Sequence, residues 1–231
     1  MDSKPMVPLN FKRREEAEVR DAAKAHYEAI RTRRTVREFS SDPVPREVIE
    51  NCIRAAGTAP SGANLQPWHF AAVSNPVVKR KIREASEIEE REFYESRAPE
   101  EWLNVLKPFR TDAIKPFIEK APWLIPVFSV NSYLNEKGRK QQTYYPKESV
   151  GIATGFLINA LHAAGLVTLT HTPSPMNFLN GILKRPPAEK PFLLLIVGYP
   201  AEGVQVPDNT RKPLEEIVTF VLGNRKVGQG V

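Results

Sequence analysis

The stretch GTAPSGANLQPWHF, from Gly57 to Phe70, has no charged side chain in a chain whose residues are 26% charged. It belongs to a longer run between Arg54 and Lys79 that also carries no charge. Glycine, proline, serine and asparagine interrupt its apolar residues, and these residue types break helices and favour irregular backbone. The stretch therefore predicts a loop that leads through Trp68 into a strand. Two interpretations remain open: a tight helix-to-strand connection, or a surface whose main-chain groups face a flat, neutral ligand.

Hydrophobic periodicity on either side of this loop predicts alternating helices and strands. The expected helices cover 13–31, 46–56, 76–97, 111–120, 151–164 and 176–184, and the expected strands cover 69–74, 123–130, 167–172 and 191–197. The segment 214–222 fits either a helix or a strand. Few strands among longer helices predict a layered α/β (α+β) domain. No repeat or linker divides the chain, so 1–12 is interpreted as a flexible arm and 13–231 as one domain.

The composition is that of a soluble protein with 231 residues, 41% of them hydrophobic, which is enough for a large core. The net charge is +6, but 33 basic residues are interspersed with 27 acidic ones, which argues against nucleic-acid binding. The single cysteine, Cys52, excludes an intramolecular disulfide and indicates a reducing compartment. Gly165 and several polar side chains interrupt the uncharged run 151–172, so we expect no membrane span and a cytoplasmic protein. The 4 histidines show no metal-ligand spacing.

Four arginines occur close together in RTRRTVREF, which runs from Arg31 to Phe39. Guanidinium groups this close repel one another unless an anion or a carboxylate neutralises them. They could form a solvated basic turn paired with Glu38 or Glu47, or a phosphate clamp to which Thr35 adds a hydroxyl. The chain has neither GxGxxG after a strand nor GxxxxGK[ST], so a nucleotide-like phosphate would have to be held by arginines.

RRTVREF followed by APSGANLQPWHF resembles the FMN-dependent nitroreductase superfamily, and the resemblance continues through LTHTP (169–173) and TRKPL (210–214). It implies a nitroreductase-like fold, in which helices flank a central mixed sheet. It also implies an intertwined homodimer with flavin sites at the interface and FMN as the cofactor. The uncharged helix at 151–164 suits such an interface, although it could equally form the core of a monomer.

The resemblance also assigns cofactor contacts to individual residues. The phosphate, ribityl chain and pyrimidine edge would be contacted by Arg33, Arg34, Thr35, Arg37 and Arg211. Pro60, Ser61 and Gly62 would follow the ring, and Ala63 would offer its backbone N–H to whatever stacks above it. Thr170, His171 and Thr172 would line the ring from a strand. Thr172 is the expected catalytic residue, because its hydroxyl would donate to flavin N5 and favour one-electron steps.

A long charged segment, SEIEEREFYESRAPEEWLNVLKPFRTDAIK, lies between the first two clear strands and covers 86–115. Glu90 and Tyr94 are four residues apart and so share one helical face, and Lys115 follows later. Its composition alone is typical of a solvated, mobile helix. The spacing of these three residues, however, is similar to that of the substrate-binding Glu, Tyr and Lys of the iodotyrosine deiodinase branch. That resemblance implies a substrate lid over about 86–115.

The resemblance implies reductive dehalogenation of halotyrosines to tyrosine and halide. Glu90 would bind the substrate ammonium group and Lys115 its carboxylate, while Tyr94 covers the site and Ala63 N–H meets the phenolate. Electrons would come from a separate reductant or reductase, with NADP the expected nucleotide. Two other functions stay open: a broad-range FMN nitroreductase or quinone reductase, and a non-catalytic FMN-binding protein. Neither needs a clamp for a zwitterion.

Overall fold

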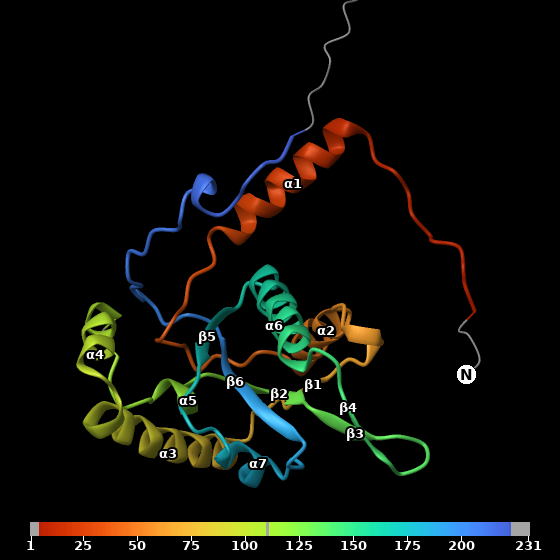
Figure 1. Cartoon of the computed structure of the whole chain (residues 1–231). Helices are drawn as coiled ribbons and strands as arrows, with labels where there is room; N and C mark the ends of the chain where they lie inside the picture. The colour runs from red at the N-terminus through yellow and green to blue at the C-terminus, as the bar shows by residue number, and fades with distance from the viewer. Residues whose placement is uncertain (1–4, 110, 223–231) are drawn as a thin grey trace, which may run out of the picture.

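The computed structural model describes residues 5–109 and 111–222 (Figure 1). Its main helices are α1 (Glu16–Ile30), α2 (Arg46–Gly57), α3 (Pro76–Glu92), α4 (Glu100–Leu106), α5 (Phe117–Lys120), α6 (Pro146–Ala163) and α7 (Phe178–Leu183). Its strands are β1 (Trp68–Phe70), β2 (Trp123–Val130), β3 (Ser132–Leu134), β4 (Lys140–Gln142), β5 (Val167–His171) and β6 (Glu189–Gly198). Short 3-10 turns cover Gly62–Asn64, Lys107–Phe109 and Leu214–Glu216, and a π-helical turn covers Phe93–Arg97.

The central sheet has the strand order β1-β2-β6-β5. Its three strand pairs are antiparallel, with β2 and β6 in the middle. Among the described residues, the parallel part of the expected mixed sheet is a single bridge, in which Thr35 pairs with Thr168 of β5. This bridge fixes the arginine-rich segment against the edge of the sheet. The strands β3 and β4 form a separate hairpin.

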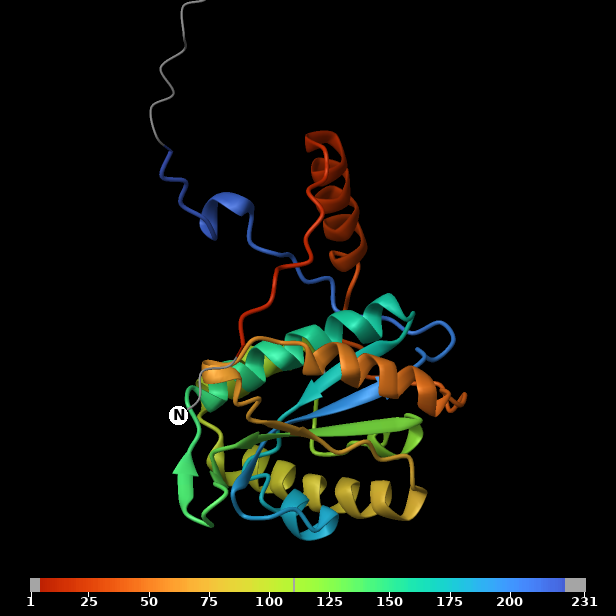
Figure 2. The same ribbon diagram turned by 90° about the vertical axis from the view of Figure 1, so that its right-hand side faces the viewer.

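Helices cover both faces of the sheet (Figure 2). On one face α2 and α6 pack on Ile125 and Val127 of β2, and on the other α3, α5 and α7 pack on Leu124 and Phe128 of the same strand. This alternation follows from the two-residue period of a strand. Because both faces are buried, β2 and β6 are continuous apolar runs rather than alternating ones.

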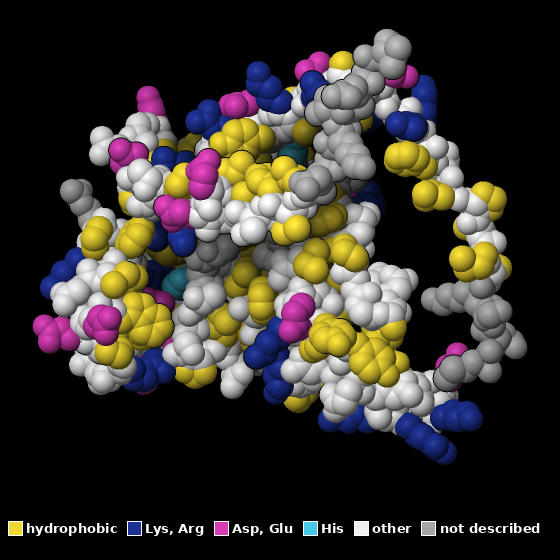
Figure 3. All heavy atoms as spheres, turned by 45° about the horizontal axis from the view of Figure 1, so that its top comes forward, with side chains coloured by type: hydrophobic (Ala, Val, Ile, Leu, Met, Phe, Trp, Pro, Cys, Tyr) yellow, Lys and Arg dark blue, Asp and Glu magenta, His cyan; other side chains and the backbone are white. Residues whose placement is uncertain are grey.

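The ends of the described chain lie outside this body. Helix α1 has no buried residue and projects away from the sheet (Figure 2). The segment before it carries apolar side chains in the open, as Figure 3 shows along the extended N-terminal arm. The segment after β6 likewise exposes Ile217, Phe220 and Leu222. Helix α6 also exposes apolar side chains on its outer face, because Ile152 and Phe156 each remain 44% accessible.

Several expected elements differ in extent from the observed ones. The helix expected over 111–120 is only Phe117–Lys120, and Pro116 is its N-terminal cap. A proline has no backbone N–H and its ring clashes with the preceding turn, so it is tolerated at the start of a helix but not in its interior. The charged helix expected to reach Arg97 ends at Glu92 and continues as the π-helical turn. The segment 214–222, expected as a regular element, holds only one 3-10 turn. The hairpin of β3 and β4 was not expected.

Candidate active site

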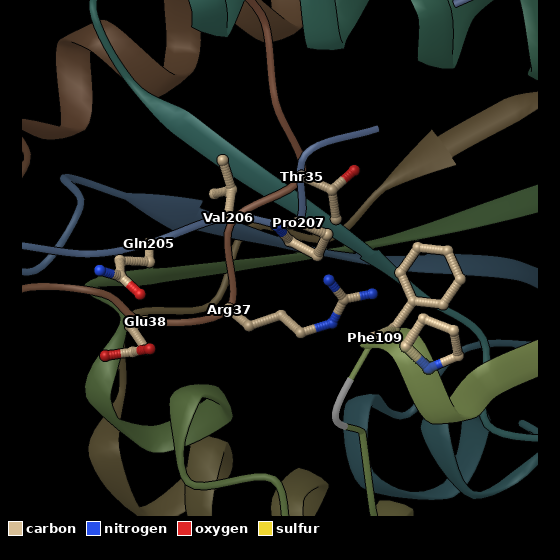
Figure 4. Close-up of a pocket in the computed structure, with 8 residues that line it drawn as sticks. Thr35, Arg37, Glu38, Phe109, Gln205, Val206 and Pro207 are labelled. Atoms are coloured by element: carbon tan, nitrogen blue, oxygen red, sulfur yellow. The ribbon is translucent and has the colours of Figure 1, made fainter. Parts of the chain in front are cut away.

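The arginine-rich segment and the C-terminal segment meet at one edge of the sheet. Arg34 donates a hydrogen bond to the carbonyl of Pro207, and Arg211 Nη2 donates to the carbonyl of Arg33 at 3.3 Å. A small cavity of about 90 Å³ lies between the two segments. It is lined by Arg34, Thr35, Arg37, Phe109, Val206, Pro207, Asn209 and Arg211. A larger cavity of about 360 Å³ adjoins Thr35 and Arg37 (Figure 4).

The charge of these arginines is not neutralised within the described part of the chain. Among residues 5–109 and 111–222, no carboxylate lies within 4.0 Å of the guanidinium groups of Arg33, Arg34, Arg37 or Arg211, whereas the neighbouring Arg31 pairs with Glu28. Glu38 points away from the Arg37 guanidinium (Figure 4). Burial lowers the pKa of Arg33, and the nearby Arg211 and Arg34 lower it further. The cluster is therefore not a turn neutralised by Glu38 or Glu47, and its guanidinium groups are left with the capacity to pair with an anion.

A third cavity, of about 250 Å³, lies between β5 and the charged segment 86–115. Its aromatic and aliphatic walls come from Phe93, Tyr94, Trp102, Leu106, Phe117 and Leu169. Its polar groups come from Arg37, Glu90, Thr111, Lys115, Thr170, His171, Thr172 and Ser174. Arg37 lines both this cavity and the 90 Å³ cavity beside the arginines, so the two are neighbouring compartments. Burial lowers the pKa of Arg37.

The structure brings Glu90, Tyr94 and Lys115 together at this cavity. Lys115 Nζ lies 3.1 Å from Glu90 Oε2, and the two side chains are 3% and 13% exposed. Lys115 Nζ also donates to Thr111 Oγ1 at 3.1 Å, and the Tyr94 hydroxyl is 3.4 Å from the same oxygen. Burial raises the pKa of Tyr94, so its hydroxyl stays a proton donor at neutral pH. The negative side chain of Glu90 and the positive side chain of Lys115 thus lie side by side, and the Lys115 ammonium group lies against the Tyr94 ring.

His171 adds a polar atom that nothing in the described chain satisfies. Its Nε2 is buried without a hydrogen-bond partner among the described residues, 3.9 Å from Glu90 Oε1. Burial, followed by Lys115 and Arg37, lowers the pKa of His171 to about 3, so the ring is neutral. Thr170 and Thr172 line the same cavity from β5 and the residue that follows it. A buried, unpaired nitrogen facing a cavity fits a ligand that supplies its partner.

The uncharged loop has an unusual backbone. Ala63, Asn64 and Gln66 have φ angles of 51°, 55° and 49°, a region that residues with a side chain rarely adopt. Ser61 Oγ accepts a hydrogen bond from Gln66 N at 2.9 Å and closes the loop. A Cβ at Gly62 would lie 3.1 Å from the Cβ and the carbonyl oxygen of Tyr144, so only glycine fits without a shift. Strain of this kind is concentrated at functional sites.

This loop lies far from the arginines within one chain. Gly62 packs on Tyr144, two residues before α6 begins, whereas Thr32, directly before Arg33, is hydrogen-bonded to His162 near the end of α6 at 3.1 Å. The 18 residues of α6 separate these points by roughly 25 Å at 1.5 Å per residue. None of the cavities described above is lined by Pro60, Ser61, Gly62 or Ala63. The arginines, the β5 residues and the lid residues are brought together, and the loop is not.

Some residues of the site could not be inferred from the sequence. Thr111 connects Tyr94 with Lys115, and the ring of Phe109 stacks 5.9 Å from the Arg37 guanidinium. Both lie just before Lys115 in the chain, which is the only signal that pointed to them. Asn209 lines the 90 Å³ cavity beside the arginines, but no periodicity indicates that the C-terminal segment returns to the arginines.

The described residues contain neither a membrane-spanning helix nor a cluster of metal-ligating side chains. Within 5–109 and 111–222, no helix is both long enough and apolar enough to cross a lipid bilayer. In the same ranges, no group of three His, Cys, Asp or Glu side chains is arranged to hold a metal ion.

The chain is similar to known proteins over most of its length. The nitroreductase family model matches residues 30–199. An iodotyrosine deiodinase of Haliscomenobacter hydrossis is 54% identical over 213 residues, which cover 92% of this chain and 96% of that protein. Iodotyrosine deiodinase 1 of Rattus norvegicus is 46% identical over 207 residues, covering 89% and 73%.

Solved structures show the same likeness. The crystal structure of oxidized iodotyrosine deiodinase bound to FMN and 3-iodo-L-tyrosine superposes with a TM-score of 0.73 at 31% identity, covering 87% of this chain and 99% of that one. A nitroreductase with bound FMN from Bacteroides fragilis superposes with a TM-score of 0.63 at 20% identity, over 85% and 98%, and shares the fold.

Proposed function

This chain belongs to the nitroreductase family, and we propose that it is an FMN-dependent enzyme that removes halogen from halotyrosines to give tyrosine and halide. The carbon–halogen bond breaks and a carbon–hydrogen bond forms, with two electrons and one proton consumed and one halide released. The observation that carries this proposal is the ion pair of the buried Lys115 with the largely buried Glu90, in which the Lys115 ammonium group lies against the Tyr94 ring. The pair lies next to an unneutralised arginine cluster.

The pair of opposite charges matches a free amino acid. An amino acid carries an ammonium group and a carboxylate on one carbon, and Glu90 and Lys115 complement them with the opposite signs. The rings of Phe93, Tyr94 and Trp102 give the rest of the cavity the apolar walls that an aromatic side chain requires. A nitroreductase of broad range or a protein that only stores FMN has no use for this charge pattern.

The chain also has groups that suit FMN. Arg33, Arg34 and Arg211 would hold its phosphate, because their charges have no carboxylate partner among the described residues, and Thr35 would add a hydroxyl. Arg37, Thr170, His171 and Thr172 would contact the ring, and His171 Nε2 is an unsatisfied atom that such a ligand would meet. Pro60, Ser61 and Gly62 would lie along the ring as an uncharged surface. When bound, FMN supplies the electrons for the cleavage of the carbon–halogen bond.

The protein groups orient the substrate and exclude water. Glu90 and Lys115 fix the amino-acid end, and Tyr94 closes over the cavity from the lid, which we define as residues 86–115. Ala63 offers its backbone N–H to the phenolate oxygen, and Thr172 offers its hydroxyl to the cofactor ring. A separate reductant or reductase is the source of the electrons that FMN would supply.

We further infer that the active unit is a homodimer whose two sites combine the arginines of one protomer with the loop of the other. The roughly 25 Å between the two groups in one chain supports this, because FMN contacts both sets only if a second copy contributes one of them. The exposed apolar side chains of α6, of the segment before α1 and of the segment after β6 are suited to pack against that second copy.

The substrate is tested by titrating the FMN-loaded protein with 3-iodotyrosine while flavin fluorescence is recorded. We expect saturable quenching by iodotyrosine, and release of iodide and tyrosine when a reductant is added. 2-Iodophenol, which lacks the amino-acid group, should bind poorly. If iodotyrosine does not bind while nitroaromatic compounds are reduced readily, the broad nitroreductase function replaces this one.

The shared site is tested by mixing two inactive variants. Arg34→Ala breaks the arginine half and Gly62→Val breaks the loop half, so each homodimer should lose FMN. If the sites form across the interface, a refolded equal mixture contains mixed dimers with one intact site each. Such a mixture should recover about a quarter of the wild-type sites. No recovery despite proven mixing would mean that each site lies within one chain.

A further inference from the structure

One face of α3 carries a row of polar residues directed at the segment 115–121. Lys79, Arg83, Glu87 and Glu90 follow one another at spacings of four, four and three residues, which places them along one side of the helix. Helix α3 runs alongside α5 in the structure (Figure 1). Lys79 and Glu87 are 7% and 6% exposed, which is unusual for charged side chains and indicates that each has its own hydrogen-bond partners.

The first residues of this row anchor α5. Lys79 Nζ donates to the carbonyl oxygens of Glu119 at 2.8 Å and Ala121 at 2.7 Å. Arg83 donates from Nε to Glu119 Oε1 at 2.5 Å, and from Nη1 to Glu87 Oε2 at 2.6 Å. Arg83 therefore joins the carboxylate of α5 to that of Glu87 and keeps the latter in a fixed orientation.

Glu87 and Glu90 then hold Lys115 at two points. Glu87 Oε1 accepts a hydrogen bond from the backbone N–H of Lys115 at 2.8 Å, in a buried position. Glu90 Oε2 pairs with Nζ of the same residue at 3.1 Å. One carboxylate fixes the main chain of Lys115, and the next one along the helix face contacts its charged end.

We propose that Glu87 is a positioning residue for substrate recognition, because it fixes the main chain of Lys115 so that Nζ points into the cavity. This inference rests on the proposed function. A bound zwitterion would engage Glu90 with its ammonium group and Lys115 Nζ with its carboxylate, so the contact between these two side chains is the one that substrate replaces. The bond from Glu87 to the backbone N–H is not replaced and holds Lys115 in both states.

Such fixation should act on binding rather than on the chemical step. If Lys115 is ordered before substrate arrives, its ordering costs nothing during binding. Without Glu87, the loop at Lys115 would have to be ordered by the substrate itself. The KM for halotyrosine should then rise, while kcat of the bound substrate stays near the wild-type value.

The test compares Glu87→Gln with Glu87→Met, because glutamine keeps a carbonyl oxygen for the Lys115 N–H and methionine, of similar size, does not. We expect Glu87→Met to raise KM for iodotyrosine by about tenfold with kcat nearly unchanged, and Glu87→Gln to stay within about threefold of wild type. Binding of 2-iodophenol and FMN should not change in either. Glu84→Gln, an exposed carboxylate on the same helix, is the matched control and should behave as wild type.

Three results would overturn the proposal: a wild-type KM in Glu87→Met, equal losses in both Glu87 variants, or an equal loss of 2-iodophenol binding. Should Glu87→Met fail to fold, hydrogen exchange of the wild-type protein gives the answer. The Lys115 amide should exchange far more slowly than that of Ala113, with and without iodotyrosine, and equal exchange would refute the contact. Failure of wild type to bind iodotyrosine refutes the proposed function instead, so the two failures are distinct.

Discussion

Lys115 Nζ lies 3.1 Å from Glu90 Oε2, and both side chains are nearly excluded from solvent while they line a cavity of about 250 Å³. A buried ion pair of this kind contributes little stability, because desolvation of the two charges offsets their attraction. The position of the pair at an aromatic cavity therefore calls for another explanation. The position is explained if a ligand with two opposite charges binds there, so that its positive group pairs with Glu90 and its negative group with Lys115.

Removal of either charge should impair the recognition of halotyrosine. Glu90→Gln or Lys115→Ala leaves one charge of the bound zwitterion without a partner, and a stranded charge of this kind costs about 2–5 kcal/mol. We expect this loss in iodotyrosine affinity, measured by flavin fluorescence titration, with FMN content unchanged. Reduction of substrates without an amino-acid group should be spared.

Exposed residues of the same segment provide the controls for this prediction. Glu95→Gln and Lys107→Ala remove one charge each from the lid without touching the cavity. They should bind iodotyrosine as wild type does. Limited proteolysis adds a second measurement, because substrate should protect the lid in wild type and in these controls but not in the Glu90 and Lys115 variants. Normal binding by the latter pair would rule out the clamp.

The arginine cluster should determine how tightly FMN is held. Arg33→Ala or Arg34→Ala removes a charge-assisted contact to the phosphate, which is worth roughly 1.5–3 kcal/mol, or about 10- to 150-fold in affinity. The check is the ratio of flavin to protein absorbance after dialysis. Arg31→Ala removes the same charge nearby, but Arg31 is paired with Glu28, so that variant should stay yellow. A colourless wild type that is active would contradict the assignment of FMN.

The parts of the fold that the sequence predicted well are those with burial on both sides. The strand expected over 123–130 is found at Trp123–Val130, and the one expected over 191–197 lies within Glu189–Gly198. Long apolar runs leave no other place for these residues than the middle of the sheet. The charged segment 86–115 was harder, because its turns depend on Pro99 and Pro116 and on contacts with distant residues rather than on periodicity.

The candidate site shows the same limit. Local motifs indicated the arginines of 31–37 and the uncharged loop, since each consists of neighbours in the chain, and the spacing of Glu90, Tyr94 and Lys115 indicated the lid residues. Their arrangement in space depends on α6, which places the loop at one end and the arginines at the other. The bond from Glu87 to the Lys115 backbone is likewise invisible in a sequence, because any residue except proline offers the same N–H group.

Thr172 should influence the dehalogenation reaction without affecting cofactor binding. It lines the cavity beside Thr170 and His171, and its hydroxyl is the group that we expect to face the flavin ring. Thr172→Ala should therefore retain FMN and iodotyrosine binding but slow the release of iodide. Reduction of nitroaromatic compounds should be kept or improved. The ratio of the two rates, measured with one reductant, is the readout. An unchanged ratio would remove Thr172 from the reaction.

His171 has a consequence for stability that can be worked out from its surroundings. It is buried between Lys115 and Arg37, and its pKa is lowered from 6.5 to about 3, chiefly by burial. Glu90 lies 3.9 Å away, but its charge is matched by Lys115. The folded state therefore keeps His171 neutral, whereas the unfolded chain binds a proton below pH 6.5. Because the unfolded state binds more protons, stability falls as the pH decreases from 6.5 towards 3.

The variant His171→Thr should remove this penalty. Between pH 7 and pH 5 a single histidine that protonates only in the unfolded chain lowers the free energy of unfolding by about 2 kcal/mol. We expect wild type to lose that much more stability than His171→Thr over this interval, measured by urea unfolding in excess FMN at both pH values. His26→Asn, on the exposed helix α1, is the control and should retain the wild-type pH dependence. If the free energy of unfolding of His171→Thr depends on pH as that of wild type does, His171 accepts a proton in the folded state. The conclusion that its ring is neutral beside Glu90 and Lys115 would then be wrong.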